Sequence, residues 1–355
     1  MRTYFSITTI VMKYCIACIL FFLFVFAEAQ NEKKASVFKG YYPIAEKPML
    51  SFGLGNNNYE EIIFDAKPTV YYGIINTMAR RLSAENRSLG DAVYITFQPH
   101  IRMYAENSKP VKTPSYRFMG GWQRLLKVGN DNFFTFGIES GHYSNGQSRC
   151  AFDETLEDEM EPCALLYDTF TDQTNLSTIL NRSTGNFSTN LTRLLFNYRF
   201  NRFDSSNRPT LIHSFTLNYR LYHNNFWGLF DFGGYPPYDI DIYGRHNFKA
   251  SYEFIHSFKK IRYSIFTGVD VLPDSHASVE PFRFEGTASI YPLDTDMGFF
   301  VSYTYGHDNY NYRFVDSFHR LSFGVIWDWF TPFEIRRAKR EEPETTTAFT
   351  GYGLK

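Results

Sequence analysis

The chain has 355 residues and a nearly balanced charge, with 36 Lys and Arg against 37 Asp and Glu and a formal net charge of −1. Because there is no basic excess to match phosphates, nucleic acid is excluded as a partner. The length allows one large domain or two ordinary ones. The aromatic content is high, at 19%, although the mean hydropathy is slightly polar.

The N-terminus holds the stretch that most resembles a membrane-spanning helix. Lys13 precedes the apolar residues 16–26, and small residues follow. A positive charge, a short apolar run and then small residues are typical of a secretory signal peptide. We therefore expect a signal peptide over residues 1–29, with Met12 as an alternative start. A polar periplasmic lead-in over residues 30–47 would follow it.

Alternating segments fill the chain between residues 48 and 332. Apolar and polar residues alternate there as they do in half-buried β-strands, for example Leu321 and Phe323 against Ser322. About twelve such segments lie at residues 49–55, 67–77, 91–104, 115–126, 132–144, 187–201, 210–222, 243–256, 260–270, 282–291, 298–306 and 318–330.

The connections between these segments alternate in length. Those after the even segments are mostly short, such as residues 257–260, and the one after the fifth segment is the longest. Short turns at one end, long loops at the other and an even strand number are typical of an outer-membrane β-barrel. Lipid forbids open sheet edges, so the sheet must close. We predict an all-β, transmembrane antiparallel barrel in a bacterial outer membrane, with a flexible periplasmic tail over residues 333–355.

A secreted β-sandwich is the alternative fold. It would also alternate along its strands, and five Asn-X-Ser/Thr sequons would suit its glycosylation. The sequons are Asn86, Asn175, Asn181, Asn186 and Asn190. The alternation in connection length favours the barrel, with its aromatic faces toward lipid and Arg, Glu, Ser and Thr in the lumen. In a barrel rich in Asn and Ser, such sequons arise by chance.

His142 and Ser144 end the fifth segment. Positions i and i+2 of a strand point to the same face, so both project from the face that carries Phe134 and Phe136. A base beside a hydroxyl is the first requirement for a serine nucleophile. If the first strand begins in the periplasm, the fifth ends at the cell exterior. The pair then lies on the lipid-facing wall near the outer leaflet, beside phospholipid ester bonds.

The longest connection, residues 149–185, carries the two cysteines that remain after the predicted cleavage. An even pair in an exported protein favours a disulfide between Cys150 and Cys163. The loop surrounds an acidic run, residues 153–161. The simpler interpretation is a solvated, disulfide-tied extracellular loop. The alternative is a divalent-cation site, because hard oxygen ligands suit Ca²⁺.

The residues around the His142–Ser144 pair resemble a known signature. The stretch His142-Tyr-Ser-Asn-Gly-Gln-Ser148 is similar to the His-X-Ser-Asn-Gly-Arg-Ser motif of outer-membrane phospholipase A, a family of twelve-stranded barrel lipases. Residues 108–116, 192–194 and 305–314 also resemble segments of that family. The resemblance implies a phospholipase that hydrolyses acyl esters of membrane phospholipids. It also implies activation by Ca²⁺ and by assembly into a homodimer.

The same resemblance assigns catalytic roles. Ser144 is the implied nucleophile and His142 the general base, with backbone N–H groups around Gly146 as the oxyanion hole. The family's third catalytic residue is an asparagine that orients the histidine. Counting back without gaps from the Thr-Arg-Leu segment places Ser188 there, which departs from the family pattern. Strand alternation puts Asn186 and Asn190 on the same outward face as Ser188, so either asparagine could serve after a small register shift.

The calcium ligands are also implied by the resemblance. They are the backbone carbonyl of Gln147, the hydroxyl of Thr184 and, from the second subunit, about Ser108. Gln147 stands where the family has arginine, a change that a backbone ligand tolerates. A non-catalytic barrel, either porin-like or structural, is the alternative function, with His142 and Ser144 as interfacial polar residues. The preference for sn-1 or sn-2 esters stays open.

Overall fold

The structure is a computed structural model that describes residues 46–56, 60–77, 89–105, 111–129, 132–203, 209–225, 234–258, 260–293 and 295–327. The expected signal peptide, most of the expected lead-in and the expected tail lie outside the described residues. Ser108 and the end of the twelfth expected strand also lie outside them. None of the described helices is long and apolar enough to cross a membrane.

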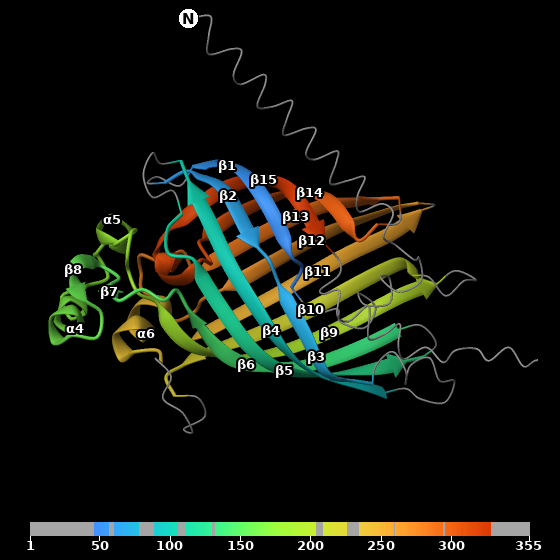
Figure 1. Ribbon diagram of the computed structural model, residues 1–355, viewed down its shortest axis with the longest axis horizontal. Coiled ribbons are helices and arrows are strands. Elements are labelled where there is room, and N and C mark those ends of the chain that lie inside the picture. Colours follow the sequence, from blue (N-terminus) through green and yellow to red (C-terminus); the bar gives the residue numbers. More distant parts are fainter. Residues whose placement is uncertain are drawn as a thin grey trace, which may run out of the picture.

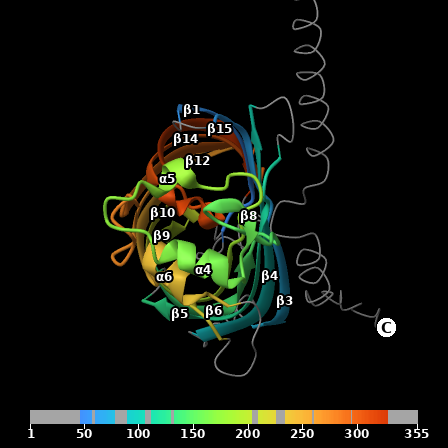
Figure 2. The same cartoon turned by 90° about the vertical axis from the view of Figure 1, so that its left-hand side faces the viewer.

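One antiparallel sheet closes on itself to form a barrel (Figures 1 and 2). Its strands are β1 (Met49–Asn56), β2 (Ile62–Lys67), β3 (Val70–Asn76), β4 (Leu89–Tyr104), β5 (Ser115–Val128), β6 (Asn132–Ser144), β9 (Ser188–Phe203), β10 (Pro209–His223), β11 (His246–Phe258), β12 (Ile261–Val271), β13 (Phe282–Pro292), β14 (Met297–His307) and β15 (Ser317–Trp327). Each strand pairs with its neighbour around the ring, and β1 joins β15 to close it.

The β2 and β3 strands are two halves of one barrel strand, because both pair with β4. The interruption falls at Pro68, which has no N–H to give to the ladder. Counted this way, the barrel has the twelve antiparallel strands that the sequence predicts. The second strand begins at Ile62, earlier than the expected residue 67, since the stretch before Pro68 pairs with the far end of β4.

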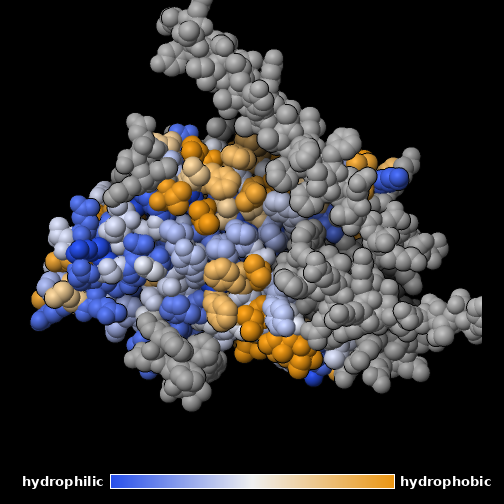
Figure 3. All heavy atoms as spheres, in the orientation of Figure 1, coloured by the Kyte–Doolittle hydropathy of each residue, from blue (hydrophilic) through white to orange (hydrophobic). Residues whose placement is uncertain are grey.

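Side chains alternate between the two sides of the barrel wall. The expected outward face of β15 is confirmed, because Leu321 and Phe323 are about half exposed while Ser322 between them is buried in the lumen. In Figure 3, hydrophobic residues gather over the strands, and hydrophilic residues gather over the end that carries the loops. An apolar exterior with a polar, charged interior suits a sheet that crosses lipid.

A folded cap covers the barrel end where the long connections meet (Figure 2). Its elements are β7 (Arg149–Cys150), β8 (Asp153–Glu157), α4 (Glu161–Tyr167), α5 (Leu176–Ile179), α6 (Pro237–Tyr243) and the 3₁₀ helix η1 (Asn311–Val315). Residues from three connections form its core: the ring centroids of Phe187 and Tyr243 lie 5.7 Å apart, and those of Phe187 and Phe314 lie 6.0 Å apart. The barrel end with the short turns carries no such cap among the described residues.

The expected disulfide between Cys150 and Cys163 is present, with the two Cα atoms 5.8 Å apart. The acidic run around it does not converge on one point. Asp153 Oδ1 accepts hydrogen bonds from Thr155, and Glu157 pairs with Arg149 at 3.0 Å. No group of three or more His, Cys, Asp or Glu that could hold a metal ion occurs in the part of the chain that the structure describes. The loop is a packed part of the cap rather than only a solvated one.

The connection between β14 and β15, which contributes η1 to the cap, also contacts the inner side of the barrel wall. The Asn311 backbone N–H donates to the Tyr143 hydroxyl at 2.6 Å, and the Tyr310 hydroxyl donates to the His100 carbonyl at 3.2 Å. Arg313 is fully buried against Glu60. These contacts fill the outer part of the lumen with protein.

Candidate functional site

The outward face of β6 carries the pair singled out from the sequence. His142 and Ser144 are half-buried, and Tyr143 between them is buried on the lumen side. Both residues therefore share the lipid-facing wall, as expected from the strand period. They lie where β6 ends below the cap, at the end of the barrel that carries the long loops (Figure 1).

The neighbouring strands supply one aromatic and one polar partner to each residue. In the ladder, Ser144 lies between Tyr116 of β5 and Ser188 of β9. Two residues earlier in β6, His142 lies between Phe118 of β5 and Asn190 of β9. Tyr116 and Phe118 are among the exposed aromatic side chains. The pair is thus bordered by an apolar surface on the β5 side and by polar groups on the β9 side.

Asn190 is the β9 residue opposite His142, and it binds the imidazole. His142 Nδ1 and Asn190 Oδ1 are 3.2 Å apart. On its other side, the Asn190 amide NH₂ donates to the Asn224 backbone carbonyl. Because that carbonyl can only accept, Asn190 must turn its oxygen toward His142. Nδ1 of His142 is then the donor in this hydrogen bond, and in the neutral imidazole with that tautomer Nε2 is the acceptor nitrogen.

The other two candidates for the third position lie elsewhere. Ser188 is opposite Ser144 in the ladder rather than opposite His142. The Asn186 side-chain NH₂ donates to Asp158 Oδ2 at 2.7 Å, inside the cap. The ungapped count from the sequence placed Ser188 in the third position, but the hydrogen-bond partner of His142 is Asn190. Within the described chain, no hydrogen bond joins the Ser144 hydroxyl to His142.

A second row of polar side chains lies next to the His142–Asn190 pair, on the same outer wall. Ser140 Oγ lies 2.8 Å from Thr192 Oγ1, which in turn lies 2.9 Å from His223 Nε2. His223 is opposite Asn190 across the β9–β10 ladder. The polar patch formed by β6, β9 and β10 therefore extends beyond the two residues of the motif, which strand alternation alone did not indicate.

The turn after Ser144 is held by the buried side chain of Asn145. Its NH₂ group donates to the Gly185 carbonyl at 2.7 Å, and its Oδ1 accepts from the N–H groups of Phe187 and Gln147 at 3.1 and 3.2 Å. Gly146 adopts a φ of 66°, a conformation that favours glycine. Among the described residues the Gly146 N–H has no hydrogen-bond acceptor, so it remains available to an oxyanion.

The implied calcium ligands are only partly described, because Ser108 lies outside the described residues. The Asn145–Gly185 bond holds the Gln147 turn against the segment that carries Thr184. The Thr184 hydroxyl is already engaged with the Asn181 side chain, at 3.2 Å from its Nδ2. A carbonyl and a hydroxyl are hard oxygen donors of the kind that Ca²⁺ prefers. The donor chemistry fits the ion, although neither donor carries a charge.

Two residues of the candidate site could not be identified from the sequence. Asn145 is part of the motif, but its buried side chain binds the Gly185 carbonyl and the Phe187 N–H, which lie about 40 residues further along the chain. Asn224 acts through its backbone carbonyl, so its side chain gave no signal. Asn190 was recognisable as outward-facing, and only the cross-strand register selects it over its neighbours.

Comparison with known proteins gives fold-level similarity. No protein-family model matches the chain, and no curated protein sequence matches it. An outer membrane phospholipase dimer with bound calcium from Salmonella typhi aligns over 84% of this chain and 98% of its own, with 9% identity and a TM-score of 0.45. The NanC porin aligns over 79% and 99%, with 8% identity and a TM-score of 0.40. LpxR from Salmonella typhimurium aligns over 80% and 100%, with 8% identity and a TM-score of 0.33.

The closed barrel itself defines the class of protein. Every strand is paired around the ring, the exterior is apolar and the interior holds buried charges. Such a sheet satisfies its backbone within lipid without an open edge. The protein is a twelve-stranded β-barrel of the bacterial outer membrane.

Proposed function

We propose that this barrel is an outer-membrane phospholipase A that hydrolyses acyl esters of phospholipids. The observation that carries the proposal is the row of Ser144, His142 and Asn190 on the outer wall, just below the cap. A water-soluble substrate has no reason to reach a site bordered by exposed aromatic side chains, whereas a phospholipid in the outer leaflet places its ester bonds at this depth. The signature around Ser144 supports the same activity.

In the proposed mechanism, Ser144 Oγ attacks the ester carbonyl carbon while His142 Nε2 takes the serine proton. The Asn190 oxygen accepts the Nδ1 proton, which holds the imidazole in the required tautomer and orientation. The Gly146 N–H donates to the negative charge that develops on the carbonyl oxygen. His142 then protonates the leaving lysophospholipid oxygen. A water molecule, deprotonated by the same nitrogen, releases the fatty acid from Ser144.

Calcium and a second subunit belong to this proposal as implied partners. The Gln147 carbonyl and the Thr184 hydroxyl would hold the ion, which when bound adds positive charge near the oxyanion. Because neither donor is charged, we expect modest affinity and full release by a chelator. Residues of the chain itself bind the ester, orient the histidine and move the proton.

The test is a phospholipid hydrolysis assay on purified protein in detergent, with Ser144→Ala, His142→Ala, Asn190→Ala and Ser188→Ala beside the wild type. Ser144→Ala and His142→Ala should abolish activity. Asn190→Ala should lower kcat by up to about 10,000-fold, the loss that follows when the orienting aspartate of a serine protease is replaced by asparagine. The matched control, Ser188→Ala, should stay within about threefold of the wild type because the imidazole keeps its partner.

Full activity in Ser144→Ala would rule out the proposed nucleophile. A larger loss in Ser188→Ala than in Asn190→Ala would instead return the third position to Ser188, the position given by the ungapped count. In that case the lipase proposal would stand with a different orienting residue.

A further inference from the structure

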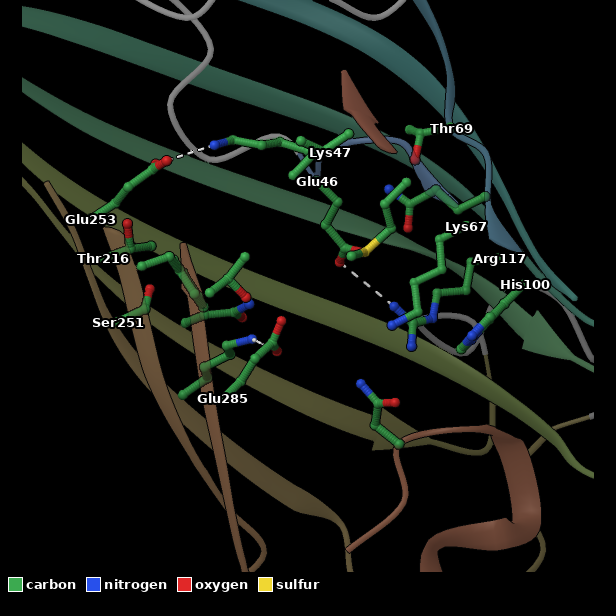
Figure 4. A pocket seen from close by; sticks show the side chains of 18 of the residues that line it. Glu46, Lys47, Lys67, Thr69, His100, Arg117, Thr216, Ser251, Glu253 and Glu285 are labelled. Atoms are coloured by element: carbon green, nitrogen blue, oxygen red, sulfur yellow. Dashed lines mark hydrogen bonds and ion pairs between the residues drawn. The ribbon is translucent and has the colours of Figure 1, made fainter. Parts of the chain in front are cut away.

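The barrel lumen contains a cavity of about 250 Å³ that plays no part in the proposed lipase chemistry. Six lysine or arginine side chains and three glutamates line it. Two further carboxylates, Glu139 and Asp270, lie behind the lining and pair with Arg193 and Arg220, which leaves an excess of one positive charge. Hydroxyl and amide side chains from β10, β12 and β13 complete the wall. In Figure 4, Lys67 and Arg117 reach into the cavity from one side, and Glu253 and Glu285 reach in from the other.

Each carboxylate on the acidic side of the cavity is paired with a lysine. Lys47 Nζ lies 2.5 Å from Glu253 Oε1, and Lys249 Nζ lies 3.8 Å from Glu285 Oε2. Both carboxylates thus have a cation, and the arginines that line the cavity lie on the opposite wall. Lys47 belongs to the expected periplasmic lead-in, so the end of that segment lies inside the barrel.

The basic wall is formed by Arg117 of β5, Arg193 of β9 and Arg220 of β10. Glu46, also from the end of the lead-in, reaches this wall: its Oε1 lies 2.6 Å from Arg193 Nη1 and 3.6 Å from Arg117 Nη1. The Glu46 side chain stays 39% exposed to the cavity. Arg193 also pairs with Glu139, whose Oε2 accepts from the Arg193 Nε at 2.6 Å. For Arg117, Glu46 is the carboxylate within 4 Å among the described residues.

Arg220 is the least satisfied of the three arginines. It is buried, and its Nε has no hydrogen-bond partner among the described residues. Its ion pair with Asp270 is long, at 3.8 Å, and the other oxygen of that carboxylate accepts from Asn247. A buried charge with poor pairing is costly. An additional anion in the cavity would remove this cost.

We propose that Arg117, Arg193 and Arg220 form a binding site for a small oxyanion of the phosphate or carboxylate type. Glu46 occupies part of this site from the same chain and competes with the free anion. Guanidinium forks match the geometry of such oxyanions and bind them with charge-assisted hydrogen bonds. The site is independent of the lipase proposal, since all three arginines lie on the lumen side of the wall.

We expect the anion to enter from the barrel end opposite the cap. The cap closes the other end directly above the site, where Arg117 lies under the Tyr143 ring, with Cζ 4.5 Å from the ring centroid. Tyr143 and Tyr222 both belong to the buried core of the cap. Small periplasmic anions can reach the cavity without passing through this core.

The test is a titration of full-length protein in detergent micelles with inorganic phosphate, by calorimetry in phosphate-free buffer at constant ionic strength. We expect Glu46→Gln to bind phosphate about tenfold more tightly than the wild type, because the competing carboxylate is removed. We expect Arg220→Met to bind it at least about tenfold more weakly. Arg124→Met is the matched control: Arg124 also lies on β5, paired with Asp91 at 2.8 Å, and does not line the cavity.

Two results would overturn the site. One is equal phosphate affinity in the wild type and Glu46→Gln, including the absence of binding in both. The other is an equal heat and affinity with chloride, which would mean charge screening only. If Arg220→Met does not fold, the comparison of Glu46→Gln with the wild type still decides the question.

Discussion

Gly141 sets the spacing between β5 and β6 beside His142, the proposed general base. A Cβ at this position would overlap the Phe118 carbonyl oxygen and approach the Met119 Cα to 2.7 Å. These are backbone atoms, so the strands themselves would have to move. Gly141→Ala should therefore shift His142 out of line with Asn190.

We expect Gly141→Ala to lower kcat by at least about tenfold and the free energy of unfolding by roughly 1–3 kcal/mol, as overpacking does. Hydrolysis assays and urea unfolding in detergent would measure both. Gly120→Ala is the control on the adjacent strand, since its added Cβ would meet nothing closer than the Ser140 oxygen at 3.9 Å. Equal effects of the two substitutions would mean that the close approach at Gly141 is not what holds the site.

At the scale of elements, α6 buries a carboxyl group inside the cap. Burial raises the pKa of Asp239 well above its usual value, and the nearby Asp158 raises it further. The Tyr167 hydroxyl donates to Asp239 Oδ1 at 3.2 Å, which opposes the shift without cancelling it. Burial also raises the pKa of Asp158. The folded cap therefore favours the protonated form of both carboxyl groups.

The sign of the pH dependence follows from these raised pKa values. The stabilisation from protonated Asp239 is complete below its unfolded pKa, about 3.9, and is lost as the pH rises through the higher folded pKa. We expect the cap to open more readily at pH 8 than at pH 5, measured by amide hydrogen exchange over residues 234–245. Asp239→Asn should reduce this difference, and Asp241→Asn, an exposed position on the same helix, should keep it. A wild-type cap that opens equally at both pH values would contradict the assignment.

The strands could be predicted from the sequence, and the cap could not, for one physical reason. The alternation that marks Leu321 and Phe323 is a local pattern, so it predicts a strand even when the neighbouring strands are unknown. The cap helices are short, such as α5 (Leu176–Ile179), and their core joins connections far apart in the chain. The same limit applied at the site. His142 and Ser144 were found from their spacing, whereas the choice of Asn190 over Ser188 depends on how β9 is registered against β6.

At the scale of the whole molecule, the filled lumen bears on the porin-like alternative. The connection between β14 and β15 is anchored by several buried contacts, among them the ion pair between Arg102 Nη1 and Asp308 Oδ2 at 2.5 Å. The 16–18-stranded porins leave an aqueous channel, whereas the lumen of this narrower barrel is occupied by the connection. We therefore expect no stable conductance steps in planar bilayers. Arg102→Ala combined with Arg313→Ala should introduce a leak, since two of the buried ion pairs that anchor the connection are removed. Regular, porin-sized steps from the wild type would favour the non-catalytic alternative.

The β9 strand presents different chemistry on its two faces. Arg193 and Arg199 point into the lumen, and Asn190 lies on the lipid side. A slip of one residue during insertion would exchange these faces. Each arginine would then meet hydrocarbon, at about 2–4 kcal/mol near the bilayer midplane, and the asparagine would be lost to the interior. Membrane insertion therefore selects the one alignment in which Asn190 faces His142 on the lipid side. The same step that places the arginines in the lumen would assemble the proposed hydrolytic site.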